Sequence, residues 1–361
     1  MADQAALERV SIDPQQLRPY LGHAADVHGA RSQPPAWSDL AGALLRHQKE
    51  TWEMLRTGYA SLNSLQTRQF WFDGYEVRIQ FNPGRMTSSA AKVDDRSIRE
   101  RKCFLCLQNL PAGQRGIPYG GRYMFLCNPF PILPAHFTIP RIDHVPQRID
   151  AEFGVMLDLA RDLAPGYSVF YNGPRCGASA PDHLHFQAGT RWSMPVESEY
   201  PRLLSERGKV VESAESVQVI AVEGGERLFL SLEGKDPAGL HQTLRRYLAA
   251  LQQVRPECDE PMVNIMAWYD AGLWTVLVYP RVKHRPSFFF VEGEGKILIS
   301  PAIVDLGGIS VTPLEADFHK VTSQHLVTMY HEVQLSHPEF EASLEVFRSS
   351  EIYRDQQKSQ R

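Results

Sequence analysis

The chain has 361 residues, of which 43% are hydrophobic and 22% charged, and its formal net charge is -4. This length is too great for one ordinary compact domain, so we expect two domains or one large duplicated unit. The slight negative charge argues against a general nucleic-acid or membrane-surface binder. We see no apolar run long enough to span a bilayer and no secretory leader, so we expect a cytoplasmic protein with no nucleic-acid and no membrane partner.

The N-terminal part of the chain is expected to be helical. Residues 1 to about 37 are rich in Pro, Ala and Gln and are treated as an arm of uncertain order. From Ser38, a suitable N-cap, apolar residues recur at helical spacing as far as Leu62, which predicts one long amphipathic helix. The stretch YEVRIQFNPGR (75–85) alternates apolar and polar residues and predicts a strand that runs into a Pro-Gly turn.

The middle of the chain predicts four strands around one helix. GRYMFLC (121–127) and HFTI (136–139) are expected to be strands separated by a proline-rich turn. Apolar spacing predicts a helix over 153–163, and YSVFYNG (167–173) and HLHFQAG (183–189) predict two further strands. The expected order is therefore strand, strand, helix, strand, strand.

The second half of the chain echoes the first. PRIDHVP (140–146) and PRVKHRP (280–286) share Pro, Arg, His and Pro at equivalent places, and each follows a β-like run. A helical stretch (240–251) and the strand MVNIMAWY (262–269) precede the second copy. We therefore expect a duplicated fold whose second half, which has no H-x-H motif, is degenerate.

The stretch HLHFQ (183–187) carries two histidines and a glutamine at alternate positions. On a strand, His183, His185 and Gln187 would point one way while the two residues between them point into the core. One interpretation is a half-buried strand with a polar outer face. The other is a nucleophilic imidazole, because a histidine nitrogen can attack a phosphorus centre and form a phosphoramidate. Small residues in the preceding NGPRCGASAPD (172–182) would let backbone N–H groups approach phosphate oxygens closely.

Cys103 and Cys106 form a C-x-x-C pair in a chain of five scattered cysteines, a count that does not suggest a disulfide framework. Redox activity is one interpretation, but no thioredoxin-type βαβ unit follows the pair. Two thiolates and two distant histidines would instead complete a tetrahedral structural zinc site. The candidate histidines are His136, His144 and His183.

These motifs resemble the histidine-triad superfamily. HFTIPRIDH (136–144) followed by YNGPRCGASAPDHLHFQ (171–187) is similar to its transferase branch, in which H-x-H-x-Q is typical of galactose-1-phosphate uridylyltransferase, diadenosine tetraphosphate phosphorylase and the GDP-hexose phosphorylases. PRIDHVPQRID (140–150) and HLHFQA (183–188) resemble most closely the GDP-L-galactose and GDP-D-glucose phosphorylases, and QFNPGR (80–85) resembles a short segment of that group. The resemblance implies an α+β fold: a histidine-triad-like antiparallel sheet with flanking helices, duplicated with a degenerate second half.

By position, the resemblance implies a role for several residues of these motifs. His185 matches the family's nucleophile, and Gln187 matches the glutamine that hydrogen-bonds the nucleotidylated phosphate. Asn128 falls where the superfamily places a polar residue on the ribose hydroxyls. Asn172 and Ser179 match the loop that contacts the phosphate and orients the nucleophile.

The resemblance also implies a structural Zn²⁺. In the uridylyltransferase a C-x-x-C pair, a downstream histidine and the first histidine of the motif bind zinc, and these positions match Cys103, Cys106, His144 and His183. His136 would then be the conventional histidine before the IPR segment rather than a ligand. The zinc pattern and the GDP-hexose pattern come from different members, so the base and the sugar stay open.

Positive charge is needed to meet the phosphates of such a substrate. Arg85, Lys92, Arg141 and Arg175 lie in or beside the motifs and are the candidates. The alternative for each is a solvated surface charge.

Gln187 favours transfer over hydrolysis, because an amide cannot titrate near neutrality and assist water as a histidine could. The expected activity is nucleotidyl transfer through a covalent nucleotidyl-His185, with GDP-hexose and inorganic phosphate giving GDP and hexose 1-phosphate. The open alternatives are diadenosine polyphosphate phosphorolysis (an ATP adenylyltransferase), sugar-1-phosphate nucleotidyl transfer, a histidine-triad hydrolase, and a non-catalytic, zinc-stabilised nucleotide-binding protein. The substrate would be a nucleoside diphosphate sugar or a dinucleoside polyphosphate, and a homodimer is compatible with each.

Four segments are expected along the chain. They are an N-terminal helical arm (1–65), a catalytic half (66–215), a degenerate second half (216–345) and a polar tail (346–361).

Overall fold

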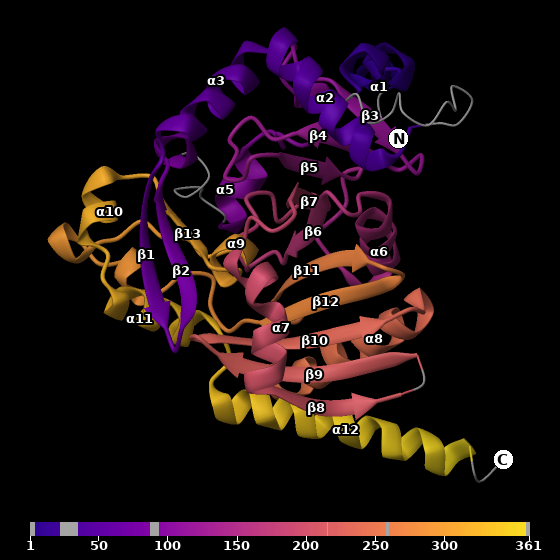
Figure 1. The fold of residues 1–361 in the computed structure, drawn as a ribbon, viewed down its shortest axis with the longest axis vertical. Helices are drawn as coiled ribbons and strands as arrows, with labels where there is room; N and C mark the ends of the chain where they lie inside the picture. Colours follow the sequence, from indigo (N-terminus) through magenta and orange to yellow (C-terminus); the bar gives the residue numbers. More distant parts are fainter. Residues whose placement is uncertain (1–3, 22–34, 87–93, 215, 258–259, 359–361) are drawn as a thin grey trace.

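The computed structural model of the protein describes residues 4–21, 35–86, 94–214, 216–257 and 260–358. In these residues the strands form a ten-stranded sheet and a three-stranded sheet (Figure 1). All neighbours in the larger sheet are antiparallel. In spatial order its strands are β3 (Gly116–Tyr119), β4 (Tyr123–Cys127), β5 (His136–Pro140), β7 (His185–Thr190), β6 (Tyr167–Asn172), β11 (Val263–Asp270), β12 (Leu273–Pro280), β10 (Arg227–Gly234), β9 (Val217–Gly224) and β8 (Gly208–Ser213).

The ten-stranded sheet consists of two halves with the same connectivity. In each half three successive strands are followed by a helix and two more strands, and the two halves meet where β6 pairs with β11. The helices are α6 (Phe153–Asp162) in the first half and α8 (Pro237–Val254) in the second. The predicted duplicated α+β fold is therefore confirmed.

The two similar proline motifs do not mark equivalent positions in this duplication. Pro140 closes β5, the third strand of the first half, whereas Pro280 closes β12, the fifth strand of the second half. The true counterpart of β12 is β7, the strand that carries His185. At that place β12 has the apolar sequence LWTVLVYP, so the second half retains the architecture without the histidines.

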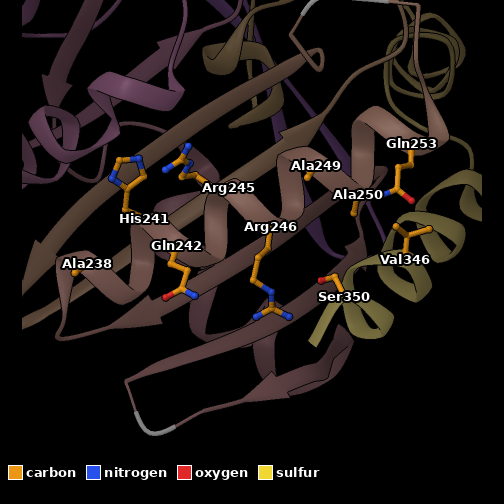
Figure 2. Close-up of a pocket in the computed structure, with 10 residues that line it drawn as sticks. All are labelled: Ala238, His241, Gln242, Arg245, Arg246, Ala249, Ala250, Gln253, Val346 and Ser350. Atoms are coloured by element: carbon orange, nitrogen blue, oxygen red, sulfur yellow. The ribbon is translucent and has the colours of Figure 1, made fainter. Parts of the chain in front are cut away.

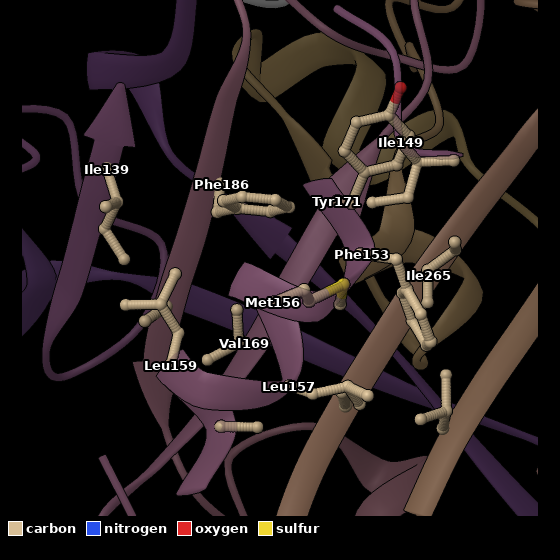
Figure 3. Close-up of a cluster of buried hydrophobic side chains, with 14 of the residues drawn as sticks. Ile139, Ile149, Phe153, Met156, Leu157, Leu159, Val169, Tyr171, Phe186 and Ile265 are labelled. Carbon is tan, nitrogen blue, oxygen red and sulfur yellow. The ribbon is translucent and has the colours of Figure 1, made fainter. Parts of the chain in front are cut away.

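Helix α6 covers one face of the first half and thereby decides which residues face the other way. Its buried residues include Phe153, Met156 and Leu157, which pack beside Phe186 of β7 (Figure 3). Successive strand residues point to opposite faces. Because Phe186 points toward α6, its neighbours His185 and Gln187 point to the opposite face. The leucines of α8, spaced as predicted, extend the same apolar layer under the second half.

The long helix predicted from Ser38 to Leu62 is two helices. Helix α2 spans Trp37–Thr51, with Ala36 rather than Ser38 at its N-cap, and α3 spans Glu53–Ser61. The break is at Trp52, whose backbone is extended (φ -128°, ψ 105°) and whose indole is buried against Gly113, where an added Cβ would lie 2.7 Å from the ring. The apolar spacing continues through this residue although the hydrogen-bonded helix does not.

Two segments of the expected N-terminal arm pack on the rest of the protein. Helix α1 (Gln4–Val10) and the 3-10 turn Pro14–Tyr20 pack on the body of the protein, and Ile12 donates its backbone N–H to the carbonyl of Gly116 at the start of β3. Residues 22–34 of the expected arm lie outside the described residues.

The three-stranded sheet joins the beginning of the chain to its end. Strands β1 (Gln66–Phe72) and β2 (Tyr75–Phe81), the latter as predicted, form a hairpin, and β2 also pairs in parallel with β13 (Ile309–Thr312). The expected boundary at residue 216 therefore assigns β2 and β13, which are paired in one sheet, to different halves of the chain. Between the two sheets lie α7 (Pro195–Arg207), α9 (Ile303–Leu306) and α11 (Ser323–Val333).

The remaining described helices are α5 (Asp95–Glu100), α10 (Glu315–Lys320) and α12 (His337–Lys358). Helix α12 runs beside β8 along the edge of the large sheet (Figure 1) and passes through the expected start of a polar tail at residue 346. Phe347 is buried in the core, so the helix is part of the fold at that point. Among the described residues, no helix has both the length and the apolar character to cross a bilayer.

Candidate functional site

A band of polar side chains crosses the face of the large sheet that points away from α6. Thr138 of β5 lies opposite Gln187 of β7, and Asn128, directly after β4, donates from Nδ2 to Thr138 Oγ1 at 3.2 Å. Asn172 ends β6, the other neighbour of β7, and shares this face with His185. The fold therefore brings together Asn128, Gln187, His185 and Asn172, four of the residues expected to contact substrate.

His185 is held in one tautomer. Its Nδ1 lies 2.8 Å from the carbonyl oxygen of His183, and because a carbonyl only accepts, Nδ1 carries the hydrogen. The lone pair is then on Nε2. The side chain is buried, and burial lowers the pKa of His185 to about 4. The imidazole is consequently neutral at pH 7, which is the form that can act as a nucleophile.

The backbone of His185 is fixed by the side chain of Gln147, which is fully buried. Gln147 Oε1 accepts from the backbone N–H of His185 at 2.7 Å, and its Nε2 donates to the carbonyl oxygen of His185 at 3.0 Å. The same Nε2 donates to the carbonyl oxygen of Asn172 at 2.9 Å. One amide thus ties the candidate nucleophile to the end of β6.

His136 determines which end of the Gln187 amide is available to a ligand. The backbone N–H of Ile132 donates to His136 Nδ1 at 3.3 Å, and burial, together with the charge of Arg85, lowers the pKa of His136 to about 3. The ring is therefore neutral, with its hydrogen on Nε2, which donates to Gln187 Oε1 at 2.8 Å. The NH₂ of Gln187 is left as a donor for an acceptor such as a phosphate oxygen.

Of the four candidate cations, Arg85 lies at this site. Its Nη1 donates to the carbonyl oxygen of Phe130 at 2.8 Å, and its positive charge contributes to the lowered pKa of His136. Burial lowers the pKa of Arg85 to about 10, so the guanidinium stays charged at neutral pH.

Two other candidate cations, Arg141 and Arg175, have different surroundings. Arg141 follows β5 and its guanidinium pairs with Glu152, which also accepts from the hydroxyl of Tyr123 in the core beneath α6. Arg175 is exposed and lines a separate cavity of about 260 Å³. Lys92 lies outside the described residues. The ion pair of Arg141 with Glu152 lies on the face of the sheet that α6 covers, opposite His185. It is a tertiary contact, so the spacing of residues in the sequence could not predict it.

The loop 172–182 is shaped by a contact with the second half of the chain. Gly177 has φ +91°, and a Cβ at this position would lie 2.7 Å from the Cβ of Ala302. A glycine is therefore required both by the backbone conformation and by the close approach. Ser179 is half-buried in this loop, and its carbonyl oxygen accepts from Arg101 at 3.2 Å.

Cys103, Cys106, His144 and His183 converge on one point. Their ligand atoms all lie within 4.8 Å of one another, with Cys103 Sγ 3.3 Å from His183 Nδ1 and Cys106 Sγ 3.2 Å from His144 Nδ1. Ligand atoms around a tetrahedral zinc are about 3.3 to 3.8 Å apart, as follows from its bond lengths. The donor set and the spacing both fit Zn²⁺. His136 belongs to the polar band and not to this cluster.

The outer contacts of this Cys₂His₂ cluster also suit a metal. His183 Nε2 donates to the carbonyl oxygen of Arg141 at 2.7 Å, which leaves Nδ1 as the coordinating nitrogen. His144 Nε2 lies 3.5 Å from a carboxylate oxygen of Asp182. Burial and the neighbouring Cys103 raise the pKa of Cys106 to about 12, so a cation would be needed to hold this sulfur as a thiolate.

The prediction that His183 and His185 share one face of a strand is wrong. Strand β7 begins at His185, and His183 lies in the preceding turn, where its N–H donates to the carbonyl of Ala180. Its ring faces the two cysteines, while its carbonyl holds the ring of His185. The two histidines of H-x-H therefore have different surroundings but are joined by one hydrogen bond.

A groove of about 640 Å³ lies between α8 and α12 (Figure 2). Two of its arginines are engaged by carboxylates: Arg246 pairs with Glu212 and Arg245 pairs with Asp150. Helix α8 covers the face of the sheet opposite His185, so this groove is not part of the candidate site.

Sequence reasoning missed two residues behind the site, Asn264 and Arg281. Both are buried, and Asn264 lies opposite Asn172 where β11 pairs with β6. The available signal for Asn264 is a polar residue within the otherwise apolar MVNIMA. Arg281 lies in the second proline motif, but its contact with Asn264 depends on the tertiary fold.

A family model described as a domain of unknown function, DUF4922, matches residues 44–190. The match includes the candidate nucleophile, the loop 172–182 and the Cys₂His₂ cluster, and it ends before Asn264 and Arg281. A search among curated proteins found no match.

Several solved structures are similar to this chain. The crystal structure of yeast Ap4A phosphorylase Apa2 in complex with AMP has a TM-score of 0.52 at 14% identity, over 81% of this chain and 96% of the yeast chain. A second crystal structure of yeast Apa2 has a TM-score of 0.48 at 14% identity, over 78% and 94%. A DUF4931 family protein from Bacillus cereus has a TM-score of 0.35 at 15% identity, over 46% and 84%. The first of these shows that the chain shares the fold of yeast Ap4A phosphorylase, which confirms the predicted fold class.

Proposed function

We propose that the protein is a phosphorylase-type nucleotidyltransferase that forms a covalent nucleotidyl-His185 and passes the nucleotidyl group to inorganic phosphate. The observation that carries the proposal is the state of His185, which is neutral, has its lone pair on Nε2 and shares a face with the NH₂ of Gln187. A nucleophile beside an oriented donor is the pair of groups that displacement at phosphorus requires.

The reaction has two displacements. His185 Nε2 attacks the α-phosphorus of the nucleotide, a P–N bond forms, and the bond to the bridging oxygen breaks, so that the rest of the substrate leaves with that oxygen. The ring becomes positively charged, and the carbonyl of His183 stabilises the N–H on Nδ1. An oxygen of inorganic phosphate then attacks the same phosphorus, the P–N bond breaks and neutral His185 is restored.

Gln187 and Arg85 assist without taking up a proton. The NH₂ of Gln187 donates to a non-bridging oxygen of the phosphate being transferred, because His136 occupies the other end of the amide. Arg85 supplies positive charge beside it. No group of this pair can act as a base toward water at neutral pH, so transfer is favoured over hydrolysis.

The substrate that we favour is a dinucleoside polyphosphate such as Ap4A. The likeness to yeast Ap4A phosphorylase covers 96% of that chain and supports this choice over a nucleotide sugar. With Ap4A, attack at one α-phosphorus would release ATP, and transfer of the adenylyl group to phosphate would give ADP.

GDP-hexose is the second candidate. It is supported by the resemblance of residues 140–150 and 183–188 to the GDP-hexose phosphorylases. Gln147 in the first of these segments binds the backbone of His185 in the second. The same chemistry would then give hexose 1-phosphate and GDP.

We also propose that Cys103, Cys106, His144 and His183 hold a structural Zn²⁺. A metal at this point would link the segment around Cys103 to His183, whose carbonyl fixes the ring of His185. Its contribution is to folding and to the position of His185, and no step of the reaction passes through it.

Product analysis with each substrate tests the proposal. Ap4A and GDP-hexose are incubated separately with the protein, with and without inorganic phosphate, and the products are separated. We expect turnover near zero without phosphate that rises and saturates with phosphate, giving ADP and ATP in equal amounts from Ap4A. Phosphate-dependent GDP from GDP-hexose, with Ap4A inert, would select the second candidate. Full-rate release of a nucleoside monophosphate without phosphate would contradict the phosphorylase and favour a hydrolase.

A further inference from the structure

Arg281, from the degenerate second half, is a buried cation whose N–H groups are all used within the protein. The side chain lies at the end of β12 and is 3% exposed. Nε donates to the carbonyl of Val333, Nη1 to Asn264 Oδ1 and the carbonyl of Pro301, and Nη2 to the carbonyls of Lys283 and His284. Every one of these acceptors is an uncharged oxygen. The guanidinium can only donate hydrogen bonds, and these five bonds hold it in one position.

The contact with Arg281 fixes the polarity of the Asn264 amide. Arg281 Nη1 lies 2.6 Å from Asn264 Oδ1, and only the oxygen of the amide can face a guanidinium. The NH₂ of Asn264 must then point the other way. It donates to Asn172 Oδ1 and to the carbonyl of Cys176, each at 2.7 Å.

The orientation of the Asn264 amide in turn determines the orientation of the Asn172 amide. Asn172 Oδ1 accepts from Asn264 and also from the backbone N–H of Ile303 at 2.9 Å, so its oxygen faces the second half. Strand β6 lies between β11, which carries Asn264, and β7, which carries His185. With its oxygen turned toward β11, Asn172 has its NH₂ on the side of the amide away from Asn264.

We propose that Arg281 and Asn264 are positioning residues that orient the Asn172 amide so that its NH₂ donates to a phosphate oxygen of the nucleotide bound at His185. The inference rests on the proposed function, which supplies the phosphate. It gives the degenerate half a role in the site although that half has no H-x-H motif. Asn172 and Gln187 would then present two NH₂ groups to the same phosphate, the first oriented by Arg281 through Asn264 and the second by His136.

The variant Asn264→Asp separates orientation from folding. A carboxylate keeps the shape of the amide and forms an ion pair with Arg281, so the buried cation remains satisfied. It cannot donate to Asn172 Oδ1 or to the carbonyl of Cys176, and the Asn172 amide should turn over to donate to it instead, which gives up the bond from the backbone N–H of Ile303. The NH₂ is then lost to the ligand, and one charge-assisted hydrogen bond corresponds to a loss on the order of 10- to 100-fold in affinity.

The measurement is AMP binding by calorimetry, together with the phosphate-dependent turnover. We expect Asn264→Asp to weaken AMP binding on the order of 10-fold or more, while the lost contacts with Cys176 and Ile303 lower the melting temperature but leave the chain folded at the temperature of the assay. Asn172→Ala should show the same loss, and Asn264→Asp added to Asn172→Ala should change affinity by no more than about twofold. The control Ser343→Ala removes a buried hydrogen bond of the second half with Tyr247 and should leave AMP binding unchanged.

The two proposals fail in different ways. Wild-type binding of AMP without phosphate-dependent transfer would refute the function but leave the orientation test intact. Equal AMP affinity in Asn264→Asp and the wild-type chain, no AMP binding by either, or a full additional loss in the Asn172→Ala background would overturn the role of Arg281 and Asn264. A folded Asn264→Asp protein with weakened binding that depends on Asn172 supports it.

Discussion

At the scale of single residues, the site depends on the direction in which neutral groups are turned. Neither His185 nor Gln187 is charged at pH 7. In the proposed reaction, His185 needs its lone pair on Nε2, and Gln187 needs its NH₂ directed toward the phosphate. The carbonyl of His183 settles this for His185, and His136 settles it for Gln187. Both partners are uncharged, so the arrangement persists over a wide pH range around neutrality.

Gln187→Glu should remove transfer without disturbing the fold. A carboxylate of the same shape still accepts from His136, but it has no N–H for the phosphate and repels it. We expect kcat/KM for phosphate-dependent turnover to fall on the order of 100-fold or more, with the melting temperature nearly unchanged. The control Gln242→Glu makes the same charge change in the groove between α8 and α12 (Figure 2) and should leave kcat/KM as it is. Undiminished turnover in Gln187→Glu would show that the amide does not contact the phosphate.

Among the structural elements, the C-x-x-C segment is held to the turn before β7 by its cysteines and by Arg101, which pairs with Asp182 at 2.9 Å and donates to the carbonyl of Ser179. Cys103 contacts His183 and Cys106 contacts His144, across separations of 80 and 38 residues in sequence. Few apolar residues support this point, since the cluster of buried side chains here consists of Cys103, Leu105, Cys106 and Ala180. A bound metal would supply the stability that the small cluster lacks.

Metal analysis of cysteine variants tests this account. About one Zn²⁺ per chain should copurify with the wild-type protein, and Cys103→Ser should bring the content close to zero. Because a structural site contributes folding free energy, the melting temperature should fall by on the order of 5 °C or more. Cys127→Ala, which removes a buried thiol outside the cluster, should keep its zinc. Wild-type protein without metal, purified in the absence of chelators, would contradict the zinc site and favour a redox role for the pair.

At the scale of the whole molecule, the sequence predicted what is local and missed what joins distant segments. Strands β2, β4, β5, β6 and β11, and helices α6 and α8, follow from apolar spacing, and their residues form those elements. The break at Trp52 and the parallel pairing of β2 with β13 depend on tertiary contacts that no window of sequence contains.

The same distinction applies to the site. A motif within one strand predicts His185 and Gln187, and a resemblance predicts the four converging Cys and His residues. Arg141 was misplaced because its partner Glu152 is at the start of α6, on the other face of the sheet. Asn264 and Arg281 were missed because they reach Asn172 only through the pairing of β6 with β11, where the two halves meet.

A covalent nucleotidyl-His185 can be trapped on the protein and measured by labelling. The chain is mixed with Ap4A or GDP-hexose that carries a radioactive α-phosphate, without inorganic phosphate, and the denatured protein is counted. We predict up to one label per chain that is lost in acid, as expected of a phosphoramidate, and that is released as the nucleoside diphosphate when phosphate is added before denaturation. His185→Asn should carry no label, whereas His241→Asn in the groove of α8 should be labelled like the wild-type chain. Undiminished labelling of His185→Asn would contradict a covalent nucleotidyl-His185, as would a wild-type protein that takes up no label without phosphate yet turns the same substrate over once phosphate is added.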